Sequence, residues 1–154
     1  MTLEISIADE RVPRAVAAPL RALIRATLAL ESARPAEIGV VLADDAALRA
    51  LNRRWRGIDR ATDVISFPYF AGGRGRTRLV AGDLAISMDR AFEQARRYRV
   101  TRGRELARLV IHGTLHLLGH DHHRLAERRV MRRAEARALR EAHDTVRALD
   151  ARLG

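Results

Sequence analysis

The stretch His112-Gly113-Thr114-Leu115-His116-Leu117-Leu118-Gly119-His120-Asp121-His122 places three histidines at the spacing H-x-x-x-H-x-x-x-x-x-H. The first two, His112 and His116, are four residues apart. On an α-helix, side chains at this spacing lie nearly above one another on one face, so two imidazoles can reach the same metal ion. Such a pair is a weak indication by itself. The complete pattern, with a glycine between the second and third histidines, is much rarer.

The residues around the histidines predict a helix followed by a sharp turn. Leucines and a valine recur on one face between residues 104 and 118, which indicates an amphipathic helix. Gly119 ends it, because glycine adopts the left-handed conformation readily, and His122 can then return as a third ligand. Three protein nitrogens with a fourth position open are typical of a catalytic zinc site. We therefore predict that His112, His116 and His122 bind one Zn²⁺ ion.

Three polar residues lie close to this predicted site. His120 continues the four-residue spacing from His116, but it follows the glycine, where helical spacing no longer holds. We interpret it as a residue that supports a ligand or faces the substrate. Asp121 is a candidate for orienting a histidine or for a general base. His123 is expected to be solvated at the start of the next helix.

Two protein families share the histidine spacing and differ at one residue. Metzincin proteases carry H-E-x-x-H-x-x-G-x-x-H, in which the glutamate is the general base that activates water at the zinc. This sequence has Gly113 at that position. The stretch resembles instead the H-G-x-L-H-L-x-G-x-D-H pattern of the YbeY-type endoribonucleases, which are bacterial rRNA maturation factors. His120 departs from that family, which more often has tyrosine there.

A second stretch, from Leu51 to Pro68, extends the resemblance. It is similar to the family's L-N-x-x-x-R-G-x-D-x-x-T-D-V-L-S-F-P segment almost throughout, and residues 82–87 are similar to its G-D-I-x-I-S strand. The resemblance covers roughly residues 36–150 and implies that Arg56 is the family's functional arginine. An arginine suits a phosphate because its planar fork donates two hydrogen bonds and stays protonated. The neighbouring arginines without such a match are Arg53, Arg54 and Arg60.

Length and composition bound the class of protein. The 154 residues suit one domain, 1–154, with a core of its own, and the lack of cysteine gives no sign of an oxidising compartment. Residues 1–14 contain no apolar segment of a signal peptide, and no run approaches the roughly 20 apolar residues that span a bilayer. We expect a cytoplasmic protein without membrane contact.

The net charge of the chain does not by itself indicate RNA binding. A formal net charge of +10 favours a polyanionic partner such as RNA. However, every basic residue is an arginine and alanine is abundant, which fits equally well a bias toward GC-rich codons. The low aromatic content argues against a base-stacking surface for single strands. Charge alone therefore does not decide between an RNA-binding protein and any other.

Four segments predict β-strands. Alternation of apolar and polar residues indicates a half-buried strand at 2–8, and a more continuous apolar run indicates a more central strand at 37–43. The other two lie at 63–67, where Pro68 ends the strand, and at 79–87.

Helical patterns fill most of the remaining sequence. Residues 71–78 are an exception, because their three glycines and three arginines favour a solvated hairpin tip, or else a basic loop that follows an RNA backbone. Together the elements predict an α+β fold, a small mixed β-sheet of about four strands packed with helices, with the metal site on a late helix and the turn after it. Besides the histidine helix, the predicted helices run from Pro13 to a stop at Arg34-Pro35, from the N-cap Asp44 to about residue 54, from 88 to about 97, and over the tail 124–153, whose narrow apolar stripe includes Leu125 and Val130.

The resemblance implies a zinc-dependent, single-strand-specific endoribonuclease that acts in rRNA maturation, including 16S rRNA 3′-end processing, and in ribosome quality control. RNA, chiefly rRNA, and ribosomal subunits or assembly factors are the implied partners. In this hypothesis Arg56 stabilises the charge that builds on the phosphate oxygens. The general base is left open between the metal-activated water, His120 and Asp121.

Two alternatives stay open at this point. One is a non-catalytic ribosome-assembly factor in which the metal only braces the turn at Gly119, an interpretation supported by the missing base. The other is a metzincin-like metalloprotease, which Gly113 disfavours.

Overall fold

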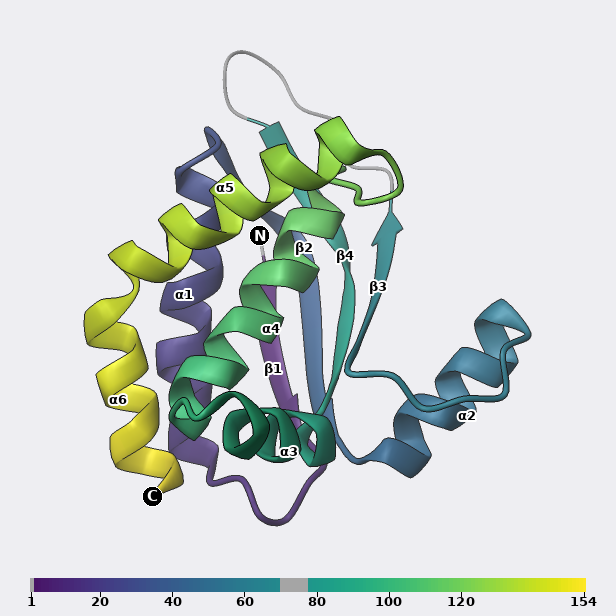
Figure 1. Cartoon of the computed structure of the whole chain (residues 1–154), viewed down its shortest axis with the longest axis vertical. Coiled ribbons are helices and arrows are strands. Elements are labelled where there is room, and N and C mark those ends of the chain that lie inside the picture. The colour runs from purple at the N-terminus through teal and green to yellow at the C-terminus, as the bar shows by residue number, and fades with distance from the viewer. Residues whose placement is uncertain (1, 70–77) are drawn as a thin grey trace.

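The computed structural model describes residues 2–69 and 78–154, in which four strands form one mixed sheet in the order β1-β2-β4-β3 (Figure 1). β1, β2 and β4 are parallel, and β3 pairs antiparallel with β4 at one edge. The predicted α+β fold with a mixed four-stranded sheet is confirmed. The prediction for residues 71–78 falls, except for Arg78, outside the described residues. The strands are β1 (Thr2–Ile7), β2 (Ala33–Ala43), β3 (Val64–Tyr69) and β4 (Arg78–Ser87).

Two prolines that the sequence predicts as terminators lie inside strands. Pro35 does not stop a helix, because α1 (Ala17–Ala29) has already ended and β2 has begun. It lies in the part of β2 that has only β4 beside it, since β1 meets β2 from Glu37 onward. Pro68 lies within the edge strand β3. A strand with one free side tolerates a residue that has no N–H to donate, so both predictions are wrong for the same reason.

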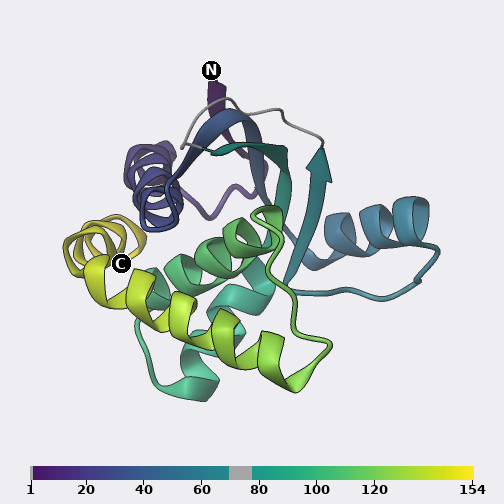
Figure 2. The ribbon, with the colours of Figure 1, turned by 90° about the horizontal axis from the view of Figure 1, so that it is seen from above.

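One face of the sheet is covered by helices (Figures 1 and 2). The 3₁₀ turn η1 (Arg14–Val16) leads into α1, which packs on β1 and β2. α4 (Arg102–Leu117) packs on β3 and β4, and α3 (Met88–Tyr98) packs on α4 and β4. The apolar side chains of β1, β2 and β4 that point to this face form the main core with those of the helices. Since α4 contacts α1, α3, α5, α6, β3 and β4, the helix with two of the candidate ligands is the centre of the packing.

The tail differs from its prediction. It forms two helices, α5 (Leu125–Glu141) and α6 (His143–Leu153), with Ala142 between them. Both pack on the outside of α4. Leu125 and Val130, expected in the apolar stripe, are exposed. Among the helices described, none is long and apolar enough to cross a membrane.

The opposite face of the sheet carries α2 (Asp45–Arg56). Its buried Leu48 packs with Ala43, Ile65 and Ala85, which point away from the main core. The side chain of Asp44 accepts a hydrogen bond from the amide of Ala47, so the predicted N-cap is confirmed. Figure 2 shows α2 set apart from the other helices, beside β3.

Candidate metal centre

The end of α4 brings the chain back toward its own last turn. The helix ends at Leu117, and Gly119 has a φ of 98°. The amide of His120 donates to the carbonyl oxygen of Leu115 over 3.0 Å, and the amide of Gly119 donates to that of His116 over 3.0 Å. This is a Schellman motif, which glycine favours at the left-handed position. The turn reverses the chain as predicted and places the next residues beside the helix.

His112, His116 and His122 come together at this turn. Their ring centroids lie 4.8 Å (His112–His116), 5.1 Å (His116–His122) and 6.0 Å (His112–His122) apart. Each ring offers one nitrogen, and these three atoms all lie within 4.8 Å of one another. The Nε2 atoms of His112 and His116 are 3.2 Å apart, close to the roughly 3.3 Å that separates two nitrogens on a tetrahedral zinc with Zn–N distances of about 2.0–2.1 Å. The group is able to bind a metal ion.

The surroundings of His116 favour its uncharged form. The pKa of His116 is lowered, first by burial and then by the proximity of His112 and His122. A histidine binds a metal through a neutral ring. The shift therefore leaves His116 in the ligating form at neutral pH.

These histidines line a cavity of about 650 Å³ that also includes Arg56. The Nη2 of Arg56 donates to the carbonyl oxygen of Ser66 over 2.9 Å, and its guanidinium lies 5.6 Å from the centre of the Phe67 ring. The side chain of Arg56, at the end of α2, thus extends past β3 to the cavity that the histidines line. The structure brings the predicted arginine and the three predicted ligands into one cavity, and the cavity lining contains none of Arg53, Arg54 and Arg60.

Gly113 lies where α4 packs closely on β3 and β4. A Cβ at this position would lie 3.0 Å from Cδ2 of Leu84 and 3.1 Å from Cγ2 of Val64, tighter than ordinary van der Waals contact. The hydroxyl of Ser66 also donates to the Gly113 carbonyl oxygen over 3.3 Å. Because α4 lies so close to β3 and β4 here, a side chain at position 113 would press on Leu84 and Val64.

The two candidate supporting residues are already engaged. The Nε2 of His120 lies 2.6 and 2.9 Å from the two carboxylate oxygens of Glu31, at the end of α1. Oδ1 of Asp121 accepts the amide of His122 over 2.6 Å, and this hydrogen bond lowers the pKa of Asp121. Both line the cavity. His123 is largely exposed before α5, as expected.

One residue near the site escapes sequence reasoning. Oε2 of Glu135, on α5, lies 3.6 Å from Nδ1 of His112, the ring nitrogen that does not face His116. No spacing rule connects the two, because they meet only through the packing of α5 on α4.

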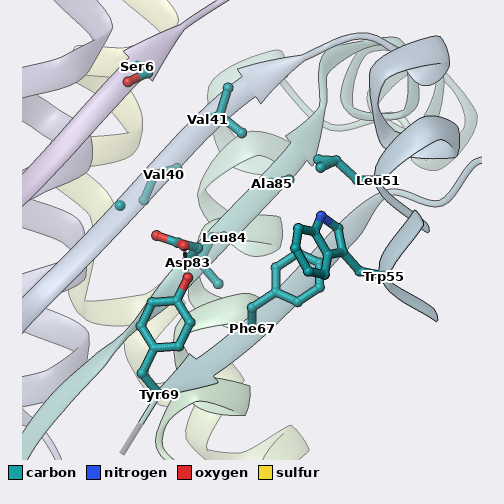
Figure 3. A pocket seen from close by; sticks show the side chains of 11 residues that line it. Ser6, Val40, Val41, Leu51, Trp55, Phe67, Tyr69, Asp83, Leu84 and Ala85 are labelled. Atoms are coloured by element: carbon teal, nitrogen blue, oxygen red, sulfur yellow. Dashed lines mark hydrogen bonds between the residues drawn. The ribbon is translucent and has the colours of Figure 1, made fainter. Parts of the chain in front are cut away.

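A second cavity, of about 490 Å³, lies on the opposite face of the sheet (Figure 3). It is lined by Trp55, Phe67 and Tyr69, which are three of the chain's six aromatic residues, and by Asp83, which accepts a hydrogen bond from the Tyr69 hydroxyl. It contains no histidine among its described residues. Its apolar lining does not make this cavity the reactive site, since the groups that can bind a metal and a phosphate line the other cavity.

Comparison with known proteins shows the family of this chain. The profile of the family described as endoribonuclease YbeY matches residues 4–143. The chain belongs to the endoribonuclease YbeY family. A protein named endoribonuclease YbeY from Anaeromyxobacter sp. is 46% identical over 140 residues, 91% of this chain and 71% of that protein. One of the same name from Roseiflexus sp. is 39% identical over 146 residues, 90% of this chain and 91% of that protein.

The fold is also known from experiment. The solution structure of TM1509 from Thermotoga maritima is similar to this chain with a TM-score of 0.67 and 27% identity, over 94% of this chain and 92% of that one. The YbeY match starts at residue 4, well before residue 36, where the resemblance in sequence begins. β1 and α1 are therefore part of the family's fold, although their sequences carry no motif.

Proposed function

We propose that this chain is a zinc-dependent endoribonuclease that cuts single-stranded RNA in rRNA maturation, including 16S rRNA 3′-end processing, and in ribosome quality control. The observation that carries the proposal is the shared cavity of Arg56 and the His112, His116 and His122 group. Membership of the endoribonuclease YbeY family supports the reaction class. Ribosomal subunits or assembly factors in the cytoplasm are the proposed setting.

Each residue has a role that its position allows. The three histidines would hold the metal through neutral nitrogens. A bound zinc ion supplies Lewis acidity and makes water a nucleophile near neutral pH. Arg56 is held by Ser66 with its guanidinium at the cavity, where it would bind the phosphate and stabilise the negative charge that develops on its oxygens.

Several described polar side chains at the cavity are already partly engaged. Asp121 accepts the amide of His122, and Asp63 accepts the amide of Val64 over 2.8 Å. His120 is paired with Glu31. We therefore assign none of these groups the role of base, which differs from the metzincin arrangement.

The test is cleavage of a labelled fragment of the rRNA 3′ end by metal-analysed wild type, beside Arg56→Ala prepared identically. We expect the wild type to cut and the variant to retain metal without cutting. Equal cleavage by both would assign the activity to a contaminant or to another site.

Because Gly113 stands where metzincins have their glutamate base, one second candidate is a ribosome-assembly factor in which the metal only braces the turn. It predicts no turnover by the wild type and ribosomal association that survives Arg56→Ala. The metalloprotease alternative has no such support, because Gly113 stands where metzincins have their glutamate base.

A further inference from the structure

Two buried polar atoms behind the metal centre have no hydrogen-bond partner among the described residues. They are Nδ1 of His112 and Oε1 of Glu135. Buried polar atoms without partners are rare in proteins, and each calls for an explanation. The two side chains face each other, because Nδ1 of His112 lies 3.6 Å from Oε2 of Glu135. A movement of about half an ångström would make this a hydrogen bond of ordinary length.

The chemistry of the ring decides which atom donates. A neutral imidazole has one N–H and one lone pair. Nε2 of His112 faces Nε2 of His116, on the side where the three histidines converge. If the Nε2 lone pair binds a metal, the proton is on Nδ1, and Nδ1 needs an acceptor. The described structure offers the carboxylate of Glu135.

Glu135 belongs to a partly buried ion-pair cluster. Nη1 of Arg108 lies 3.5 Å from Oε1 of Glu135. The same guanidinium donates to Glu105 over 2.6 and 2.9 Å, and the Glu105 side chain is only 2% exposed. These hydrogen bonds to Glu105 raise the pKa of Arg108. Two carboxylates share one guanidinium, so the cluster carries one surplus negative charge beside His112.

We propose that Glu135 is a positioning residue of the metal centre. Its carboxylate accepts the Nδ1 proton of His112, which fixes the tautomer and the ring orientation that point Nε2 toward the other two histidines. The surplus charge of the cluster also favours a dication over an empty site. A carboxylate behind a ligating histidine commonly has this effect. The inference rests on the metal site of the proposed function, but not on RNA cleavage.

A purely structural role is the competing explanation. Glu135 could serve only to fasten α5 to α4 through Arg108. That role predicts lower stability of the metal-free fold and unchanged metal affinity. Metal affinity therefore separates the two explanations.

The experiment is a Co²⁺ titration of chelator-treated protein, followed by the visible absorption of the bound ion. The variants are Glu135→Ala, Glu135→Gln and, as a control, Glu141→Ala. Glu141 is on the same helix and exposed, and its nearest partner is Arg137 at 3.8 Å. We expect Glu135→Ala to weaken Co²⁺ binding by about 10–100-fold. Glu135→Gln should bind more tightly than Glu135→Ala, because its amide oxygen still accepts the proton, and Glu141→Ala should match the wild type.

The outcomes separate this inference from the proposed function. Co²⁺ binding by Glu135→Ala within about twofold of Glu141→Ala, with the same spectrum, would overturn the positioning role. If Glu135→Ala does not fold, Glu135→Gln decides: Co²⁺ binding weaker than in the wild type supports the positioning role, because the amide lacks the carboxylate charge, and binding within about twofold of the wild type overturns it. A wild type that binds Co²⁺ but cuts no RNA would refute the nuclease and leave the role of Glu135 standing.

Discussion

Arg56, the last residue of α2, donates a 2.9 Å hydrogen bond to the carbonyl oxygen of Ser66 in the edge strand β3. α2 packs on one face of the sheet, whereas the histidines lie on the other. Only an edge strand allows a side chain to pass around it in this way. The position of Arg56 at the metal cavity thus depends on the outer side of β3, where the described residues place no further strand.

Arg56→Ala should lose RNA cleavage by about 10²–10³-fold, the usual effect of removing one donor that stabilises a transition state. Metal content should not change, because Arg56 is not among the residues that could hold the ion. Arg56→Lys should restore only part of the activity, since an ammonium lacks the planar fork. Arg54→Ala, on the same helix, is the control, and equal losses in both variants would argue against a specific role for Arg56.

His116→Ala should lose metal and cleavage together. In the wild type, zinc at about 100 times its dissociation constant should raise the free energy of unfolding by about 2.7 kcal/mol. The variant should show no such gain in a urea titration. A zinc-dependent gain of the same size in His116→Ala would mean that the ion binds elsewhere.

Stability of the metal-free protein should depend on pH through His116. Its pKa in the folded state is lowered, chiefly by burial, whereas the unfolded value is about 6.5. Below that pH the unfolded chain takes up a proton that the folded chain does not, so the free energy of unfolding falls as the pH drops. The loss ends below the folded-state pKa. Urea unfolding in chelator across pH 5–8 should show this slope, and His116→Ala should reduce it.

Gly113→Ala should lower the free energy of unfolding by about 1–3 kcal/mol, as overpacking of a well-packed core does. The added methyl would press on Leu84 and Val64. Urea unfolding of the metal-free protein measures this without any contribution from the metal site. A stability equal to that of the wild type would show that α4 can move away from the sheet.

His120→Tyr should keep metal and activity within a few-fold of the wild type. The Nε2 of His120 is engaged with Glu31 rather than with the other histidines, and tyrosine is the residue that the YbeY resemblance associates with this position. A general base would show a loss of about 10²–10⁴-fold instead. Single-turnover cleavage rates at equal metal content distinguish these results.

The convergence of His112, His116 and His122 was predictable because it is local. One helix and the Schellman turn at Gly119 bring together residues that are close in sequence, and both leave clear signals. Arg56 was predictable only through family resemblance. Its route to the cavity depends on which strand lies at the edge, and no periodicity encodes strand order.

The errors have the same origin. Pro35 and Pro68 stop neither a helix nor a strand here, because each lies where the sheet has a free side. The contact between Glu135 and His112 depends on the angle at which α5 crosses α4, and Ala142 divides a tail whose composition is helical throughout. These are properties of tertiary packing, and local patterns do not specify them.

The free side of β3 also has a consequence for solubility. An uncovered strand edge is a template on which another chain can add, and proteins protect such edges from aggregation. Here Pro68 offers no amide hydrogen, and Arg56 occupies the Ser66 carbonyl oxygen. Arg56 therefore also blocks a backbone position where a strand of another molecule would pair. Its loss would make the edge of β3 more prone to aggregation, besides impairing the site.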